Sequence, residues 1–212
     1  ALAASVATAG TLAAYEFAPL VEHGKLELTV VDVGQGDSVF VSFPDGKRML
    51  MDGGGLLSFN RQRKPQIDTG QDVVAPYLWT RRMPRVDVIA SSHAHEDHTG
   101  GLPSLIDVFS PREIWTGANP VSETWTAVIG AAERVKAPVR SFRAGERFPY
   151  GGATIEILSP PEDYEPARTP KNNDSLVLLI EHGQTRFLLS GDMEREMEWR
   201  IVESGRLPKI DV

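Results

Sequence analysis

The chain has 212 residues, of which 41% are hydrophobic, so it can bury one substantial core and one domain is expected. Its formal net charge of -7 gives no support for a broad nucleic-acid-binding face, although a local basic patch remains possible. The chain contains no cysteine, which excludes a disulfide framework and a thiolate metal site.

Residues 1–24 are interpreted as a lead-in to a domain that occupies residues 25–212. The first part, residues 1–14, is small and weakly apolar and falls short of the ~20 residues that span a bilayer. No basic segment precedes it, so a complete signal peptide is not visible. Two interpretations stay open: a disordered or loosely helical lead-in, which the composition favours, and the end of a transmembrane helix.

The domain is expected to begin with a meander of short strands over residues 26–31, 39–43 and 48–51. The turn after the first strand, Asp-Val-Gly-Gln-Gly-Asp-Ser, ends with Asp37 and Ser38. By itself this turn would be interpreted as a β-bulge or tight turn, since no P-loop lysine follows its glycines. Asp52 ends the third strand before three glycines, and a plain turn aspartate is one interpretation of it.

Hydrophobic periodicity predicts the remaining elements. The expected helices cover residues 72–82, 102–109, 122–136 and 193–204, and the expected strands cover residues 85–90, 113–116 and 153–158. Residues 207–212 resemble the start of one more strand. Two connections are predicted to lie near a site: the basic loop 56–70, with Arg61, Arg63 and Lys64, and the loop 159–171, which is rich in proline and charge. Arg81, Arg82 and Arg85 are interpreted as a solvated helix end rather than a phosphate clamp.

Four side chains with metal-binding chemistry follow the strand at residues 85–90. They are His93, His95, Asp97 and His98, and they include three of the five histidines in the chain. Neutral imidazole nitrogens and a carboxylate form a ligand set that divalent transition metals prefer. A polar turn with solvated histidines is the alternative. The clustering favours a metal site.

Residues 176–181 and 185–190 are predicted to form a β-hairpin around Gly183. In that register Asp192 lies opposite Asp174, with Asn173 beside it. His182 would then lie at the far end of the hairpin, on the order of 30 Å away at 3.3 Å per residue. It is therefore predicted to be a turn residue and not a ligand.

The pattern His-x-His-x-Asp-His resembles the signature of the metallo-β-lactamase superfamily. The resemblance implies an α/β fold, the four-layer αββα sandwich, in which His93 and His95 hold one metal ion and Asp97 and His98 a second. Ser190-Gly-Asp192 resembles a later motif whose aspartate bridges both metals. The resemblance implies a supporting role for Asp52 through hydrogen bonds to the metal loop. The missing cysteine excludes members that use a cysteine ligand.

Three further segments resemble the metallo-β-lactamase-like domain of the DNA-internalisation competence (ComEC) family: residues 32–38, 50–54 and the Asn-Asn-x-Ser pattern at 172–175. In that family the domain follows a membrane channel segment. The resemblance therefore implies DNA as a partner, a channel segment in the full-length protein, and a membrane-associated location on the extracytoplasmic side. It covers roughly residues 25–212.

The same resemblance leaves the ligand set incomplete. No histidine is in register near residue 174, so Asp174 or Asn173 is predicted to approach the metal, or water to fill the position. Asp37 is a further candidate ligand or supporting residue. The family implies a His-His-Gly-Ser segment beyond Val212, so the last strand or helix is interpreted as truncated. One or two divalent ions, zinc or manganese, are expected.

The predicted function is a metal-dependent hydrolase, in particular a phosphodiesterase or nuclease that cleaves DNA with metal-activated water, with Asp97 and His98 as catalytic residues. Two alternatives remain: a small-molecule ester, thioester or lactam hydrolase, and a non-catalytic metal-bound module of a DNA-uptake complex. A small apolar pocket would favour the small-molecule hydrolase. An open groove lined by Arg61, Arg63 and Lys64 would favour a polynucleotide.

Overall fold

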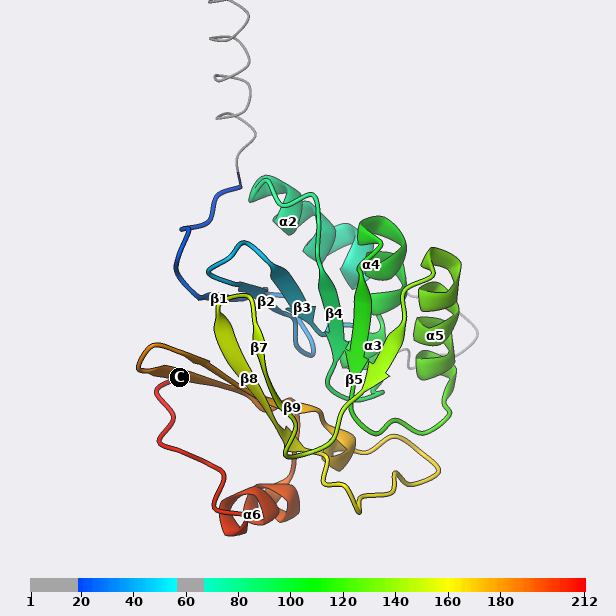
Figure 1. The fold of residues 1–212 in the computed structure, drawn as a ribbon. Coiled ribbons are helices and arrows are strands. Elements are labelled where there is room, and N and C mark those ends of the chain that lie inside the picture. Colours follow the sequence, from blue (N-terminus) through cyan, green and yellow to red (C-terminus); the bar gives the residue numbers. More distant parts are fainter. Residues whose placement is uncertain (1–18, 57–66) are drawn as a thin grey trace, which may run out of the picture.

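The computed structural model describes residues 19–56 and 67–212, which form two stacked β-sheets with helices on both outer faces (Figure 1). Most of the lead-in and the basic side chains Arg61, Arg63 and Lys64 lie outside the described residues. Within the described ranges, no helix combines the length and the hydropathy needed to cross a bilayer.

The first sheet has the strand order β1-β2-β3-β4-β5-β6. Its strands are β1 (Glu27–Val30), β2 (Val39–Ser42), β3 (Arg48–Met51), β4 (Val88–Ser91), β5 (Glu113–Thr116) and β6 (Val139–Ser141). The first three strands form the predicted antiparallel meander, whereas β3 to β6 are parallel. The carboxyl ends of β3, β4 and β5 therefore meet at one edge of the sheet, where Asp52 and the histidine motif follow.

The second sheet is antiparallel and has the order β10-β9-β8-β7. Its strands are β7 (Arg147–Tyr150), β8 (Ala153–Ser159), β9 (Val177–His182) and β10 (Thr185–Leu189). The predicted hairpin of β9 and β10 is confirmed, but Thr185 pairs with His182, so the register differs by one residue from the one expected. The reason is that the turn consists of Gly183 and Gln184 rather than being centred on Gly183.

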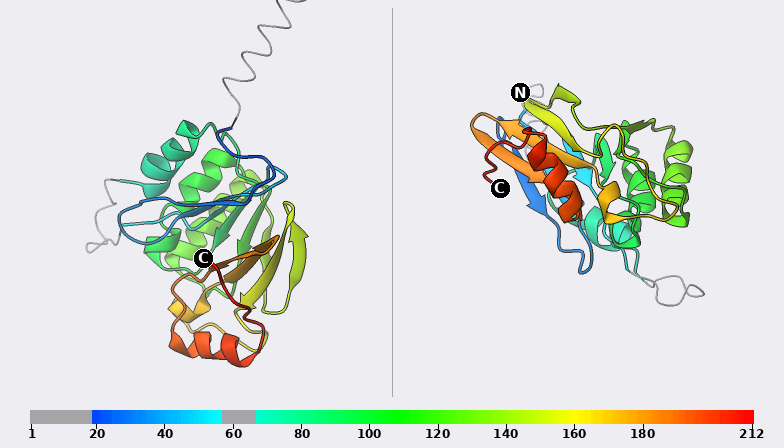
Figure 2. Two further views of the ribbon diagram at one scale, coloured as in Figure 1. Left: turned by 90° about the vertical axis from the view of Figure 1, so that its left-hand side faces the viewer. Right: turned by 90° about the horizontal axis from the view of Figure 1, so that it is seen from below.

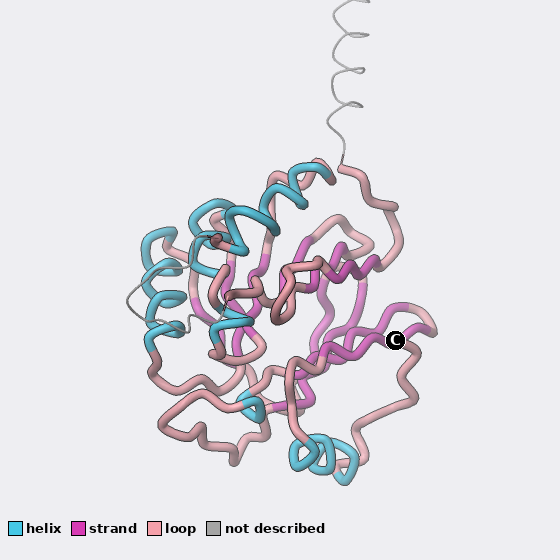
Figure 3. The backbone as a smooth tube through the Cα atoms, turned by 180° about the vertical axis from the view of Figure 1, so that it is seen from behind, coloured by secondary structure: helices cyan, strands magenta, loops and turns pink. Residues whose placement is uncertain are grey.

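Most helices pack on the outer face of the first sheet. The helical elements are η1 (Gly70–Val74), α2 (Ala75–Thr80), α3 (Glu96–Thr99), α4 (Leu102–Phe109), α5 (Glu123–Val135), η2 (Asn172–Asp174) and α6 (Arg195–Glu203). In Figure 2, α6 lies on the opposite side of the sheets from α2, α4 and α5. Figure 3 shows the same separation from behind.

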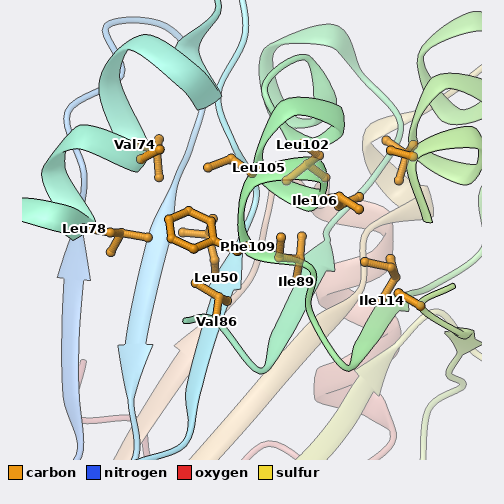
Figure 4. Packing of buried hydrophobic residues seen from close by; sticks show 14 of the residues in the cluster. Leu50, Val74, Leu78, Val86, Ile89, Leu102, Leu105, Ile106, Phe109 and Ile114 are labelled. Carbon is orange, nitrogen blue, oxygen red and sulfur yellow. The ribbon is translucent and has the colours of Figure 1, made fainter. Parts of the chain in front are cut away.

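Alternation along the strands produces three hydrophobic clusters between four layers. Leu50 and Ile89 face the helices and pack with Leu102 and Leu105 (Figure 4). Their neighbours Met49, Met51, Val88 and Ala90 face the second sheet and pack with residues such as Ile155 and Leu178. Val177 and Leu179 face outward against Ile201 of α6. The predicted four-layer αββα sandwich is confirmed.

The tail after α6 differs from the prediction. Residues 207–212 contain no strand, yet Val212 donates to the Arg186 carbonyl and accepts from the Leu188 amide, at 3.2 and 3.0 Å. This is the hydrogen-bond pattern of a parallel partner on the free edge of β10. The expected strand is therefore reduced to one residue in strand-like contact.

Candidate metal centre

Three side chains from distant parts of the sequence converge at the edge where the parallel strands end. His93 follows β4, His98 lies in α3, and Asp192 follows β10; one ligand atom from each can be chosen so that all lie within 4.8 Å of one another. The Nε2 atom of His98 is 3.4 Å from Oδ2 of Asp192. Both histidines are buried, while the side chain of Asp192 is 44% exposed, so the group opens to solvent on the aspartate side.

His95 joins this group through His93. Its Nδ1 atom is 2.9 Å from Nε2 of His93, while its Nε2 atom is 3.2 Å from the carbonyl oxygen of Pro170. The loop between β8 and η2, which contains Pro170, thus covers one side of the site, as predicted for residues 159–171. Figure 1 shows this loop at the same end of the molecule as the connection between β5 and α5.

Asp52 supports His98 from behind. Its Oδ2 atom is 3.0 Å from Nδ1 of His98, and its Oδ1 atom accepts a hydrogen bond of 2.8 Å from the backbone amide of Ser92. Asp52 is buried, with a left-handed φ of 63°, which aspartate and asparagine tolerate better than most residues. The carboxylate therefore fixes the ring of His98 so that Nε2 faces Asp192. The contacts match the supporting position that the family resemblance implies for Asp52.

The electrostatics of the two buried histidines differ. Burial, together with the smaller effects of the neighbouring rings of His98 and His95, lowers the pKa of His93 to about 3, so His93 is neutral at pH 7. Burial alone would also lower the pKa of His98. Asp52, Asp192 and Asp97 outweigh that effect and raise it to about 9. The carboxylates therefore favour a positive charge on His98, whereas His93 remains a neutral imidazole.

Asp97 and His98 lie in the short helix α3 rather than in a loop, because the carbonyl of His95 accepts hydrogen bonds from the amides of His98 and Thr99. The Asp97 side chain does not belong to the group of His93, His98 and Asp192. Its charge nevertheless contributes to the raised pKa of His98, which places it in the same electrostatic environment.

The glycine-rich turn 32–38 packs against α3. Gly36 has a φ of +76°, and a Cβ atom placed there would lie 1.7 Å from the carbonyl oxygen of Asp97. The turn therefore requires glycine at this position. Asp37 contributes its backbone carbonyl, which accepts from the amide of Gly54, while the residue itself is exposed.

The structure gives Asn173 and Asp174 other partners than a metal. Asp174 is fully buried, and its two oxygens accept from the Tyr164 hydroxyl and the Lys171 amide. The Asn173 side-chain oxygen accepts from the amide of Glu194. Neither side chain joins the histidine–aspartate group, so the prediction that one of them approaches the metal finds no support in the geometry. His182 lies beside the hairpin turn, with Nδ1 3.2 Å from the carbonyl of Gly152.

Two contacts at the site were missed in the sequence. The Ser92 hydroxyl lies 3.0 Å from Nδ1 of His93 and 3.4 Å from Nδ1 of His98, so it links the two rings. The position of Ser92 next to His93 in the sequence is the signal that could have indicated this contact. Pro170 acts through a backbone carbonyl, for which no side-chain pattern exists.

A mostly apolar groove of about 380 Å³ adjoins the centre between β1 to β3 and β10. It reaches the site at Asp37, Asp52 and Gly191 and is lined elsewhere by residues such as Met51 and Phe187. The pocket beside the site is therefore apolar where it runs along β1 and β10, the end strands of the two sheets.

The donor set fits a divalent cation. It consists of imidazole nitrogens and a carboxylate from His93, His95, His98 and Asp192, with ring nitrogens of adjacent histidines turned toward one another. On each histidine, the ring nitrogen that points away from the centre contacts a supporting group: Asp52 for His98, Ser92 for His93 and the Pro170 carbonyl for His95. Supporting groups orient metal-binding histidines in this way.

Comparison with known proteins places the chain in a family. Residues 31–210 match the model of the metallo-beta-lactamase superfamily. The chain is 31% identical to ComE operon protein 3 of Bacillus subtilis over 88% of its own length and 24% of that protein. It is 26% identical to Recombination protein 2 of Haemophilus influenzae, over 88% of its own length and 20% of that protein. The chain thus spans a quarter or less of the length of these relatives.

A solved structure shows the same fold at low sequence identity. The diiron β-hydroxylase CmlA from Streptomyces venezuelae superimposes with a TM-score of 0.52 and 18% identity, over 90% of this chain and 34% of CmlA. The family model, the fold and the histidine motif agree. The chain belongs to the metallo-beta-lactamase superfamily, whose members are generally metal-dependent hydrolases that bind one or two divalent metal ions.

Proposed function

We propose that the chain is a metal-dependent phosphodiesterase that cleaves DNA. The single observation that carries the hydrolase part is the convergence of His93, His98 and Asp192, with His95 in contact with His93. The choice of DNA is supported by the resemblance to the ComEC family and by the similarity to ComE operon protein 3 and Recombination protein 2. The same resemblance supports a membrane-associated location on the extracytoplasmic side and a channel segment as an intramolecular partner.

In this proposal His93 and His95 would hold one zinc or manganese ion, and His98, Asp97 and Asp192 would hold a second or complete the first. When bound, such an ion supplies Lewis acidity, which activates water and offsets negative charge on the substrate. The chain's own groups provide the orientation: Asp52 accepts from His98, Ser92 contacts His93, and the Pro170 carbonyl contacts His95. Asp97 lies beside His98 and is proposed to position the attacking water.

The test measures metal content and cleavage together. The purified chain is loaded with Zn²⁺ or Mn²⁺, analysed for bound metal, and assayed on single- and double-stranded fluorescent oligonucleotides. His95→Ala is expected to lower both bound metal and cleavage. His182→Ala is the matched control, because it removes a histidine whose ring faces the Gly152 carbonyl beside the β9–β10 turn rather than the candidate metal centre. Retained cleavage in His95→Ala would contradict the proposed centre.

A second candidate function, hydrolysis of a small apolar ester, thioester or lactam, is favoured by the groove beside Asp52 and Gly191. Its mostly apolar lining suits a compact apolar substrate better than a phosphate backbone. Phe187→Arg would introduce charge into this groove. It should depress turnover of an apolar ester while leaving DNA cleavage equal to or above that of the parent chain. Metal binding without turnover of either substrate would instead favour the non-catalytic module.

A further inference from the structure

The loop between β8 and η2, which covers one side of the metal centre, contacts His95 through the peptide group between Pro170 and Lys171. The carbonyl of Pro170 and the amide of Lys171 belong to the same planar peptide unit, and in a trans unit they point in opposite directions. The carbonyl lies 3.2 Å from Nε2 of His95, and the amide donates to Oδ2 of Asp174 at 2.8 Å. Any tilt that Asp174 imposes on the amide is therefore transmitted to the carbonyl that faces His95.

Asp174 is itself held in place from the other side. Its Oδ1 atom accepts a hydrogen bond of 2.7 Å from the Tyr164 hydroxyl, and its side chain is fully buried. Burial and the hydrogen bond to Asp174 raise the pKa of the Tyr164 phenol, so this hydroxyl remains a donor at neutral pH. Both oxygens of the buried carboxylate thus have partners, and a buried carboxylate that loses one of them is costly.

The consequence at His95 concerns its tautomer. If Nε2 carries the proton and donates to Pro170, Nδ1 keeps a lone pair, and it is Nδ1 that faces Nε2 of His93 at 2.9 Å. The partner of one ring nitrogen sets the state of the other, as in metal sites generally.

We infer that Tyr164 and Asp174 are positioning residues, which act through the Pro170–Lys171 peptide to hold His95 with Nδ1 directed into the centre. This inference rests on the proposed metal-binding function and deepens it. It also assigns Asp174 a role other than that of a ligand, since its carboxylate reaches the site only through the backbone.

The test uses Tyr164→Phe and Asp174→Asn in the full chain. Tyr164→Phe removes one hydrogen bond and keeps the ring, while Asp174→Asn keeps the shape but sets an amide group against a donor. Tyr77→Phe is the matched control, because the Tyr77 hydroxyl on α2 contacts Arg81 and not the site. Three quantities are measured: the tautomer of His95 by ¹⁵N NMR of the metal-free protein, exchange of the Lys171 amide, and Zn²⁺ affinity by competition with a chromophoric chelator.

The metal-free parent chain should show His95 protonated on Nε2. Tyr164→Phe should give a mixture of tautomers, faster exchange at Lys171 and about 3- to 30-fold weaker Zn²⁺ binding, somewhat below the 10- to 100-fold of a direct supporting partner. An unchanged tautomer and unchanged affinity in a folded Tyr164→Phe variant would overturn the inference. If His95→Ala binds Zn²⁺ as tightly as the parent, the metal function fails. The tautomer measurement still decides the positioning role in that case.

Discussion

Asp52→Asn tests the support of the centre most directly. Asparagine keeps the size of the side chain and tolerates the φ of 63°, so the substitution changes hydrogen bonding with little backbone strain. The carboxylate accepts from two donors at once, the Ser92 amide at 2.8 Å and Nδ1 of His98 at 3.0 Å. The amide group of asparagine has one acceptor oxygen, so one of the two donors must face an NH₂ group.

The magnitude follows from that conflict. A buried donor left without an acceptor costs about 1–3 kcal/mol, and loss of a direct supporting partner weakens metal binding by about 10- to 100-fold, which corresponds to about 1.4–2.8 kcal/mol. The two ranges overlap, so the Zn²⁺ dissociation constant should rise by at least about tenfold. The free energy of unfolding of the metal-free chain should fall by about 1–3 kcal/mol, because Asp52 is buried.

The assay is chelator competition for Zn²⁺ combined with urea denaturation of the metal-free protein. Asp107→Asn is the control, since Asp107 is 44% exposed and pairs with Arg134 on the helical face. A folded Asp52→Asn variant that binds Zn²⁺ with the affinity of the parent would refute the assignment of Asp52 as the group that orients His98.

Two further predictions concern stability. Gly36→Ala should destabilise the chain more than Gly34→Ala. An alanine at either position would adopt a positive φ and carry about 1–2 kcal/mol of left-handed strain, but only the Cβ atom at position 36 would meet Asp97. Comparable melting temperatures of the two variants would contradict this close contact. Glu181→Gln should cost less than about 1 kcal/mol at pH 7, since its partners Arg147 and Arg186 are partly exposed. Arg186 first, then Arg147, lowers the pKa of Glu181, so the stabilisation is present above the ordinary glutamate pKa and is lost as pH falls through the lowered value. Urea denaturation from pH 7 to pH 2 should therefore show parent and variant converging in acid, and a constant difference would refute the ion pairs.

Local periodicity was sufficient for several elements of the fold. The helix over residues 102–109 and the strand over residues 113–116 appear with the expected bounds, and the helix expected over 122–136 is capped at its first residue by the Ser122 hydroxyl. The two helices were predictable because their buried side chains recur at the helical period, whereas the strand is a short segment buried along most of its length. The edge strand β7 was not foreseen, since its exposure follows from its position at the border of the second sheet.

The sequence by itself determined the chemical character of the site. The groups of the site can be identified from the sequence by their side chains: the histidine motif, the aspartate after β3 and Ser190-Gly-Asp192. Their association was predictable from the motif and the family resemblance. Tertiary structure decided which groups serve the centre and how. In the folded chain, Asp174 accepts hydrogen bonds from the Tyr164 hydroxyl and the Lys171 amide, and the Pro170 carbonyl contacts His95. Backbone carbonyls are chemically the same at every residue, so the sequence carries no mark of the one that contacts the site. Only the packing of the loop over the sheet edge selects it.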